Sequence, residues 1–118
     1  MATSTPITSI AFMPLEKATL VVTVNPLDEN DAPVTPSAMT WMLTDLAGTV
    51  VNSRSNVSLT PATSVTITLS GNDLQLGSSF FNNVREVLVE YTYTSSAGSN
   101  LAGKHLVRFE IQPVAGES

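Results

Sequence analysis

The sequence predicts one all-β domain, a sandwich of two antiparallel sheets. The chain of 118 residues contains fifteen Thr and thirteen Val, and β-branched side chains suit a pleated strand better than a helix. Seven prolines interrupt any long helix. Several segments alternate apolar and polar residues with a period of two, and turn residues separate them at short spacing. Length, composition and periodicity therefore agree on a single β domain.

Five segments show this alternation most clearly, and each has one face that we expect to point into the core. The inward faces are Leu20, Val22 and Val24 in residues 18–25; Met39, Trp41 and Leu43 in residues 37–45; Val65, Ile67 and Leu69 in residues 64–70; Val87, Val89, Tyr91 and Tyr93 in residues 84–94; and Val107, Phe109 and Ile111 in residues 104–112.

The connections follow from turn chemistry. Residues 26–33 are polar and bracketed by prolines, so the chain turns there. Ala47-Gly48 predicts a tight hairpin that pairs a short strand, residues 49–51, with the Trp41 strand. Asp73 to Leu76 predicts one short helical turn with Asn72 or Asp73 as its cap. Residues 95–100 predict a loop before the last strand.

The chain divides into three parts. Residues 1–15 form an N-terminal arm or an edge strand, because Pro6 and Pro14 confine any strand there to an edge. Residues 16–113 form the sandwich, and residues 114–118 form a flexible C-terminal tail. About seven strands, an inward Trp and one short helical turn are typical of an immunoglobulin-like or fibronectin type III-like sandwich. A jelly roll or a small barrel is the competing architecture.

Composition excludes several function classes. The formal charge is −5 and the five basic residues are scattered, whereas nucleic-acid binding needs a clustered basic surface. There is no cysteine, so we expect neither a disulfide nor a Cys-based metal site. The sequence has no run of about 20 apolar residues, so we expect no membrane span. The first residues show no signal-peptide pattern. We expect no cofactor.

No residue set predicts catalysis. His105 is the only histidine, at the start of the expected last strand, and no Gly-x-Ser-x-Gly motif accompanies it. Glu86 and Glu90 share an outward strand face, but residues at i and i+4 lie about 13 Å apart along a strand, too far to flank one glycosidic bond. We therefore predict no catalytic, cofactor-binding or metal-binding residues and a protein that is not an enzyme.

Two loop motifs could carry chemistry. Asp28, Glu29, Asn30 and Asp31 offer the oxygen ligands that calcium selects, and Asp28 to Pro33 is similar to the calcium-linker motif of cadherins with one residue missing. A solvated loop is the favoured interpretation, and calcium binding stays open. Asn56-Val57-Ser58 fits the N-glycosylation pattern, which is idle without a secretory signal.

Apolar and aromatic residues suggest binding surfaces. Trp41, Tyr91 and Tyr93 could stack on sugars, but their inward parity predicts core packing, with Tyr91 or Tyr93 supplying the hydroxyl of a tyrosine corner. Met42, Leu88 and Leu106 have outward parity. If they cluster on one sheet, they form an apolar patch suited to a partner.

The segments Trp41 to Val51, Val65 to Asp73 and Glu86 to Tyr93 resemble small Ig-like domains of tailed-bacteriophage virion proteins. The resemblance, which spans residues 19–111, implies a capsid decoration protein or a head or tail accessory subunit, made in the host cytoplasm and located in the virion. It implies other virion proteins as partners, capsid or tail subunits, and a homo-oligomer or many copies in an assembly. A carbohydrate- or host-surface-binding Ig-like module is the alternative; head versus tail location, copy number and partner stay open.

Overall fold

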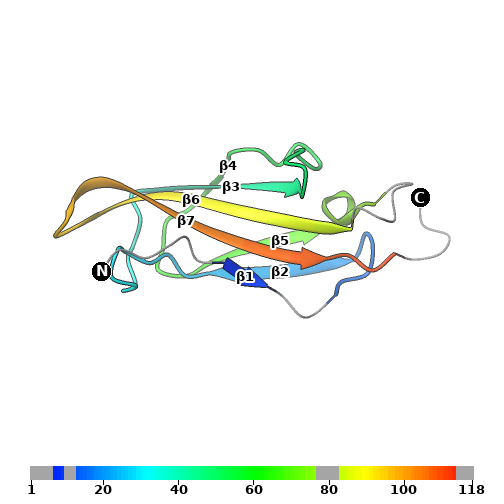
Figure 1. The fold of residues 1–118 in the computed structure, drawn as a ribbon, viewed down its shortest axis with the longest axis horizontal. Coiled ribbons are helices and arrows are strands. Elements are labelled where there is room, and N and C mark those ends of the chain that lie inside the picture. Colours follow the sequence, from blue (N-terminus) through cyan, green and yellow to red (C-terminus); the bar gives the residue numbers. More distant parts are fainter. Residues whose placement is uncertain (1–6, 10–12, 77–82, 114–118) are drawn as a thin grey trace.

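The computed structural model describes residues 7–9, 13–76 and 83–113, and it arranges their strands in two sheets (Figure 1). In the five-stranded sheet the order is β1 (Ile7–Ser9), β7 (Gly98–Glu110), β6 (Val84–Ser95), β3 (Ala38–Asp45) and β4 (Val57–Leu59). The two-stranded sheet pairs β2 (Thr19–Val24) with β5 (Val65–Ser70). All pairings are antiparallel except that of β1 with β7, which is parallel. The predicted all-β class is confirmed.

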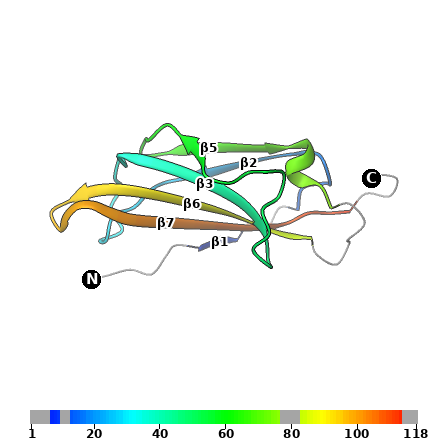
Figure 2. The same cartoon turned by 90° about the horizontal axis from the view of Figure 1, so that it is seen from above.

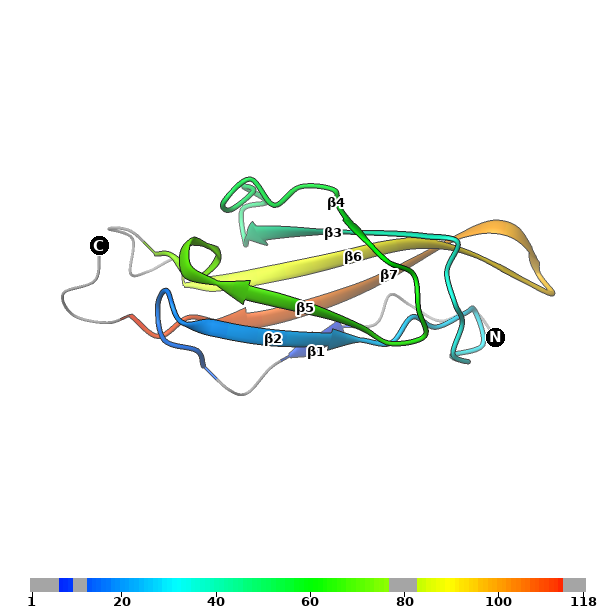
Figure 3. The same cartoon turned by 180° about the vertical axis from the view of Figure 1, so that it is seen from behind.

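The two sheets form two layers, with β2 and β5 covering one face of the larger sheet (Figures 2 and 3). The core lies between them, and every inward residue that the alternation predicts is buried there. No surface is exposed on Leu43, Leu69, Val87 and Ile111, and only 6% of the Trp41 surface is exposed. Burying such aliphatic side chains contributes about 1.5–3 kcal/mol each, so the period-two pattern is the main source of the fold.

The hairpin expected at residues 49–51 is wrong in its extent. Val50 makes only an isolated bridge with Thr44. The regular strand next to β3 on this side is β4, in which Val57 pairs with Trp41. Asn52 and Ser53 have φ values of 53° and 56°, and this left-handed backbone bends the chain out of the ladder.

The loop expected at residues 95–100 is also wrong, because β6 and β7 continue into a tight hairpin. Ser95 pairs with Gly98, and only two residues separate the strands. Gly98 has a φ of 152°, a backbone conformation that residues other than glycine rarely adopt. The last strand therefore begins at Gly98 rather than at Lys104, and the hairpin extends beyond the other strands (Figure 1).

The helical turn exists, but it begins two residues earlier than predicted. It is a 3₁₀ turn over Gly71–Leu74 with Ser70 as its N-cap. The shift arises because the Asp73 carboxylate reaches back and accepts a hydrogen bond from the Ser70 amide at 3.1 Å. Asp73 is therefore the third residue of the turn and closes a capping box.

Asp73 also ties this turn to the loop that joins β3 and β4. Its Oδ1 accepts hydrogen bonds from Asn52 Nδ2 at 2.9 Å and from Arg54 Nε at 2.8 Å. The Arg54 guanidinium lies 5.8 Å from the centre of the Trp41 ring, within the range of a cation–π contact. Burial alone would raise the pKa of the Asp73 carboxyl, but the hydrogen bonds from Arg54, Asn52 and Ser70 lower it overall.

The chain ends are described in part. Ile7–Ser9 forms an edge strand beside β7, in agreement with one of the two alternatives for residues 1–15. Leu15 makes an isolated parallel bridge with Gln112. Residues 1–6 and 10–12 and the predicted C-terminal tail, residues 114–118, lie outside the described residues.

Replacing Asp73 tests whether its network links the two sheets. We expect Asp73→Asn to lose about 1.5–3 kcal/mol of unfolding free energy at pH 7, the range for hydrogen bonds to a charged group. Because folding lowers the Asp73 pKa, this stabilisation is complete above the unfolded value of about 3.9. It is lost as pH falls through the lower folded-state pKa. Urea unfolding at pH 7 and at acidic pH should therefore show a deficit that shrinks with acidification.

Asp31→Asn is the matched control, since Asp31 is exposed and left-handed with a φ of 61°, a conformation that Asn tolerates. It should unfold like the wild type at pH 7. A deficit of Asp73→Asn that stays constant down to acidic pH contradicts the assignment of the stabilisation to the ionised carboxylate.

Candidate interaction surface

The outer face of the five-stranded sheet, the face turned away from β2 and β5, carries a row of three apolar residues. Met42 on β3 pairs with Leu88 on β6, and Leu88 pairs with Leu106 on β7. All three side chains are half-buried. The outward parity expected for them is confirmed, and the register brings them together across three adjacent strands. We call this set the apolar row.

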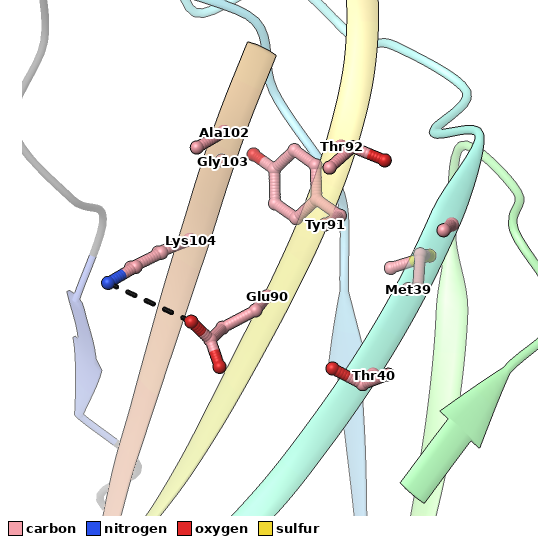
Figure 4. Close-up of a pocket in the computed structure, with 9 residues that line it drawn as sticks. Met39, Thr40, Glu90, Tyr91, Thr92, Ala102, Gly103 and Lys104 are labelled. Atoms are coloured by element: carbon pink, nitrogen blue, oxygen red, sulfur yellow. Dashed lines mark ion pairs between the residues drawn. The ribbon is translucent and has the colours of Figure 1, made fainter. Parts of the chain in front are cut away.

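Charged residues flank the apolar row on both sides. On one side Glu86 pairs with Arg108, whose Nε donates to Glu86 Oε2 at 2.8 Å. On the other side Glu90 pairs with Lys104, whose Nζ lies 3.8 Å from Glu90 Oε2 (Figure 4). Such surface pairs contribute about 0–1 kcal/mol each, so they shape the surface more than they stabilise the fold.

A shallow depression of about 300 Å³ adjoins this surface. The next row across the strands consists of the small residues Ala38, Thr92 and Ala102, and these side chains leave the depression open (Figure 4). Thr40, Glu90 and Lys104 supply its polar groups. The three strands thus present apolar, charged and small side chains in successive rows.

Gly103 lies beneath this depression and makes room for an aromatic ring. It is the β7 partner of Tyr91, and a Cβ at residue 103 would lie 2.2 Å from Cε2 of Tyr91. The Tyr91 ring therefore occupies the space that a side chain at residue 103 would take (Figure 4).

The Tyr91 hydroxyl holds the loop that follows β2. It donates to the Leu27 carbonyl at 2.6 Å and accepts from the Leu27 amide at 3.0 Å. A tyrosine corner bonds to backbone only a few residues upstream, whereas these partners are 64 residues apart, so that prediction is wrong for Tyr91. A tyrosine hydroxyl is protonated at neutral pH at its ordinary pKa of about 10, and burial raises the pKa of Tyr91 further.

The same loop is held a second time through Glu29. Its carboxylate accepts hydrogen bonds from Tyr93 Oη at 3.1 Å and from Ser95 Oγ at 2.9 Å. Its own backbone amide first, and the Ser95 hydroxyl second, lower the pKa of Glu29. The hydroxyl of Tyr93 thus binds a side chain rather than the backbone of a tyrosine corner. Trp41, Tyr91 and Tyr93 are all buried, as their parity predicts.

Two acidic residues of this loop, Asp28 and Glu29, accept hydrogen bonds from within the protein. Asp28 Oδ1 accepts hydrogen bonds from the amides of Asn30 at 2.8 Å and of Ala32 at 3.0 Å, an Asx-type turn. Glu29 binds Tyr93 and Ser95, and Asp31 is exposed. Within the described residues there is no group of three or more His, Cys, Asp or Glu that could hold a metal ion.

The remaining candidates lie apart from one another. His105 stands in the middle of β7 opposite Val89 rather than at a strand end, and burial lowers its pKa. Glu86 and Glu90 each have a basic partner on β7. Asn56 is exposed, with a φ of 52°, directly before β4. That its glycosylation motif is not used stays a prediction.

Three features of this region escape the period-two pattern: the Gly103–Tyr91 pair, the Glu29 anchor and the Arg54–Asp73 pair. A glycine inside an otherwise regular strand indicates close approach of a neighbour, but Gly103 lies just before the strand that the sequence predicts at residues 104–112, so the pattern did not reveal it. The polar pairs join residues that are distant in sequence, and composition does not indicate which residues become partners.

Comparison with known proteins adds no relative: no family model matches the chain, and neither a curated protein nor a solved structure is significantly similar to it. In the part of the chain that the structure describes, no helix has the length and apolar character needed to cross a membrane.

Replacing Gly103 tests the packing beneath the depression. We expect Gly103→Ala to lose about 1–3 kcal/mol of unfolding free energy, the usual cost of overpacking, because its new methyl group meets a ring that Leu27 holds in place. Thermal or urea unfolding measures the loss, and Ala102→Ser, at the exposed neighbouring position, should remain near the wild type. Combined with Tyr91→Leu, the Gly103→Ala substitution should cost less than the sum of the two single losses. Additive losses would contradict direct contact.

Proposed function

We propose that this protein is a structural, non-enzymatic virion protein of a tailed bacteriophage, a capsid decoration or head or tail accessory subunit that acts through protein–protein contacts. The observation that carries the proposal is the apolar row on the outer face, flanked by charged pairs. Half-exposed apolar residues that cluster beside polar ones are typical of protein–protein contact sites.

The proposal includes an Ig-like sandwich as the finer description of the fold. The strand order β1-β7-β6-β3-β4 facing β2-β5 supports it, because Ig domains oppose two sheets of this kind with Greek-key connections. The buried Trp41 on β3 is a second supporting feature.

Unpaired strand edges offer a further means of attachment to neighbouring subunits. Within the described residues β2 and β5 each have one partner. Their outward side chains are Thr, Ser and Val, and none is charged; Val21 is 55% exposed. Charged edge residues protect many sheets from pairing with another chain, so these uncharged edges support backbone contacts with neighbours.

The alternative, a carbohydrate- or host-surface-binding module, has less support. It requires aromatic side chains on the surface, and Trp41, Tyr91 and Tyr93 are each at most 6% exposed. The buried rings serve the core and the loop after β2.

Mass spectrometry of purified particles from a phage that encodes this chain tests the virion role. We expect the chain in particles in many copies, and we expect Leu88→Gln to reduce its incorporation because the polar amide weakens the apolar row. Thr60→Gln is the matched control, since Thr60 is exposed in the loop between β4 and β5 and belongs neither to the apolar row nor to the edges of β2 and β5, and it should incorporate normally. A folded wild-type chain that is present in lysate but absent from particles would refute the proposal.

A further inference from the structure

In the three rows centred on the apolar row, the charges on the outer face are sorted by strand; Glu110, the acidic residue that β7 also presents outward, lies one row further, opposite Val84. β6 presents Glu86, Leu88 and Glu90 outward, and β7 presents Arg108, Leu106 and Lys104 opposite them in the same order. One column is therefore acidic with a leucine at its centre, and the neighbouring column is basic with a leucine at its centre. We call these the acidic column and the basic column.

This sorting makes the face complementary to itself. Consider a second copy related by a two-fold axis that lies between the two faces, parallel to the strands and midway between β6 and β7. This axis exchanges the columns, so Glu86 faces the second copy's Arg108, Leu88 faces Leu106, and Glu90 faces Lys104. The contact is isologous and closes at two subunits, and the strands of the two sheets run nearly parallel, as in aligned sheet packing.

The charges disfavour the other simple face-to-face arrangement. A two-fold axis that runs across the strands through the apolar row brings Glu86 opposite the second copy's Glu90 and Arg108 opposite its Lys104. Like charges that meet across an interface weaken association. Of these two arrangements, the pattern therefore favours the one with the two-fold axis parallel to the strands.

The charged side chains have capacity for a second contact. The Arg108 side chain is 45% exposed and that of Lys104 is 50% exposed, while those of Glu86 and Glu90 are 18% and 42% exposed. A guanidinium has five donors and a carboxylate can accept about four hydrogen bonds. Each pair can thus keep its present partner and gain one from the second copy, so the contact buries no charge without a partner.

We propose that the outer face of the five-stranded sheet binds a second copy of this chain, with the acidic column of each copy against the basic column of the other. The inference rests on the proposed function only in taking this face as an assembly surface. It names the partner there as an identical chain.

Charge reversal in the full-length chain tests the proposal, with sedimentation velocity over a concentration series as the measurement. The wild type should dimerise, and more weakly at high salt because salt screens the charged contacts. Glu86→Arg places a new guanidinium against that of the second copy's Arg108, and Arg108→Glu places two carboxylates together. Each variant alone should therefore dimerise at least about tenfold more weakly.

Mixing the two variants separates a lost contact from a lost fold. In an equimolar mixture, residues 86 and 108 again meet with opposite charge, so a heterodimer should form with affinity near that of the wild type. The double variant Glu86→Arg/Arg108→Glu should dimerise by itself. Thr60→Glu, in the loop between β4 and β5, is the matched control and should dimerise like the wild type.

A wild-type chain that stays monomeric at high concentration, single variants that dimerise like the wild type, or a mixture that stays monomeric would each overturn the proposal. The virion role fails separately. A chain that is found in particles but is monomeric in solution refutes only the dimer, and a dimer absent from particles refutes only the virion role.

Discussion

The side-chain alternation of β6 is the constraint on which the rest of the structure depends. β6 is the central strand of the larger sheet, with β7 on one side and β3 on the other. Its inward residues Val87 and Val89 have no exposed surface, and Leu88 between them must then point outward. A shift of one residue would expose the core residues and bury Glu86 and Glu90. The requirement for a core thus fixes the position of every residue in the acidic column.

The same alternation explains how much the sequence could predict. A period of two reports which side of a sheet a residue faces, so the inward sets on β2, β3, β5, β6 and β7 follow from local pattern alone. It does not report which strands are neighbours. Arg54 meets Asp73, and Ser95 meets Glu29 across 66 residues of sequence, only because the sheet order brings them together. Such polar residues were therefore identifiable singly, but not as pairs.

The two connection errors have a related cause. Residues 95–100 are small and polar, which is typical of a loop, yet most of them continue the β6–β7 hairpin. A two-residue turn keeps the two strands in register up to their ends, and Gly98 supplies the unusual backbone angle. At residues 49–51 the apolar residues indicated a strand, but left-handed Asn52 and Ser53 interrupt the pairing, which resumes at Arg54 and continues in β4. Backbone conformation at single residues decided both cases, and composition gives little information about it.

The outer face and the unpaired edges lie on different layers of the molecule, and this separation bears on assembly. The Glu86–Arg108 and Glu90–Lys104 pairs are exposed enough that water and salt weaken them, so the fold does not depend on their being sorted by strand. Sorting does matter for a partner, because it makes one face complementary to itself and closes the contact at two copies. The outer edges of β2 and β5, which have no further partner strand among the described residues, lie in the opposite layer (Figure 2). A dimer formed through the outer face would leave those edges accessible on both of its outer sides, so the same subunit could pair with itself and still attach to neighbours in a larger assembly.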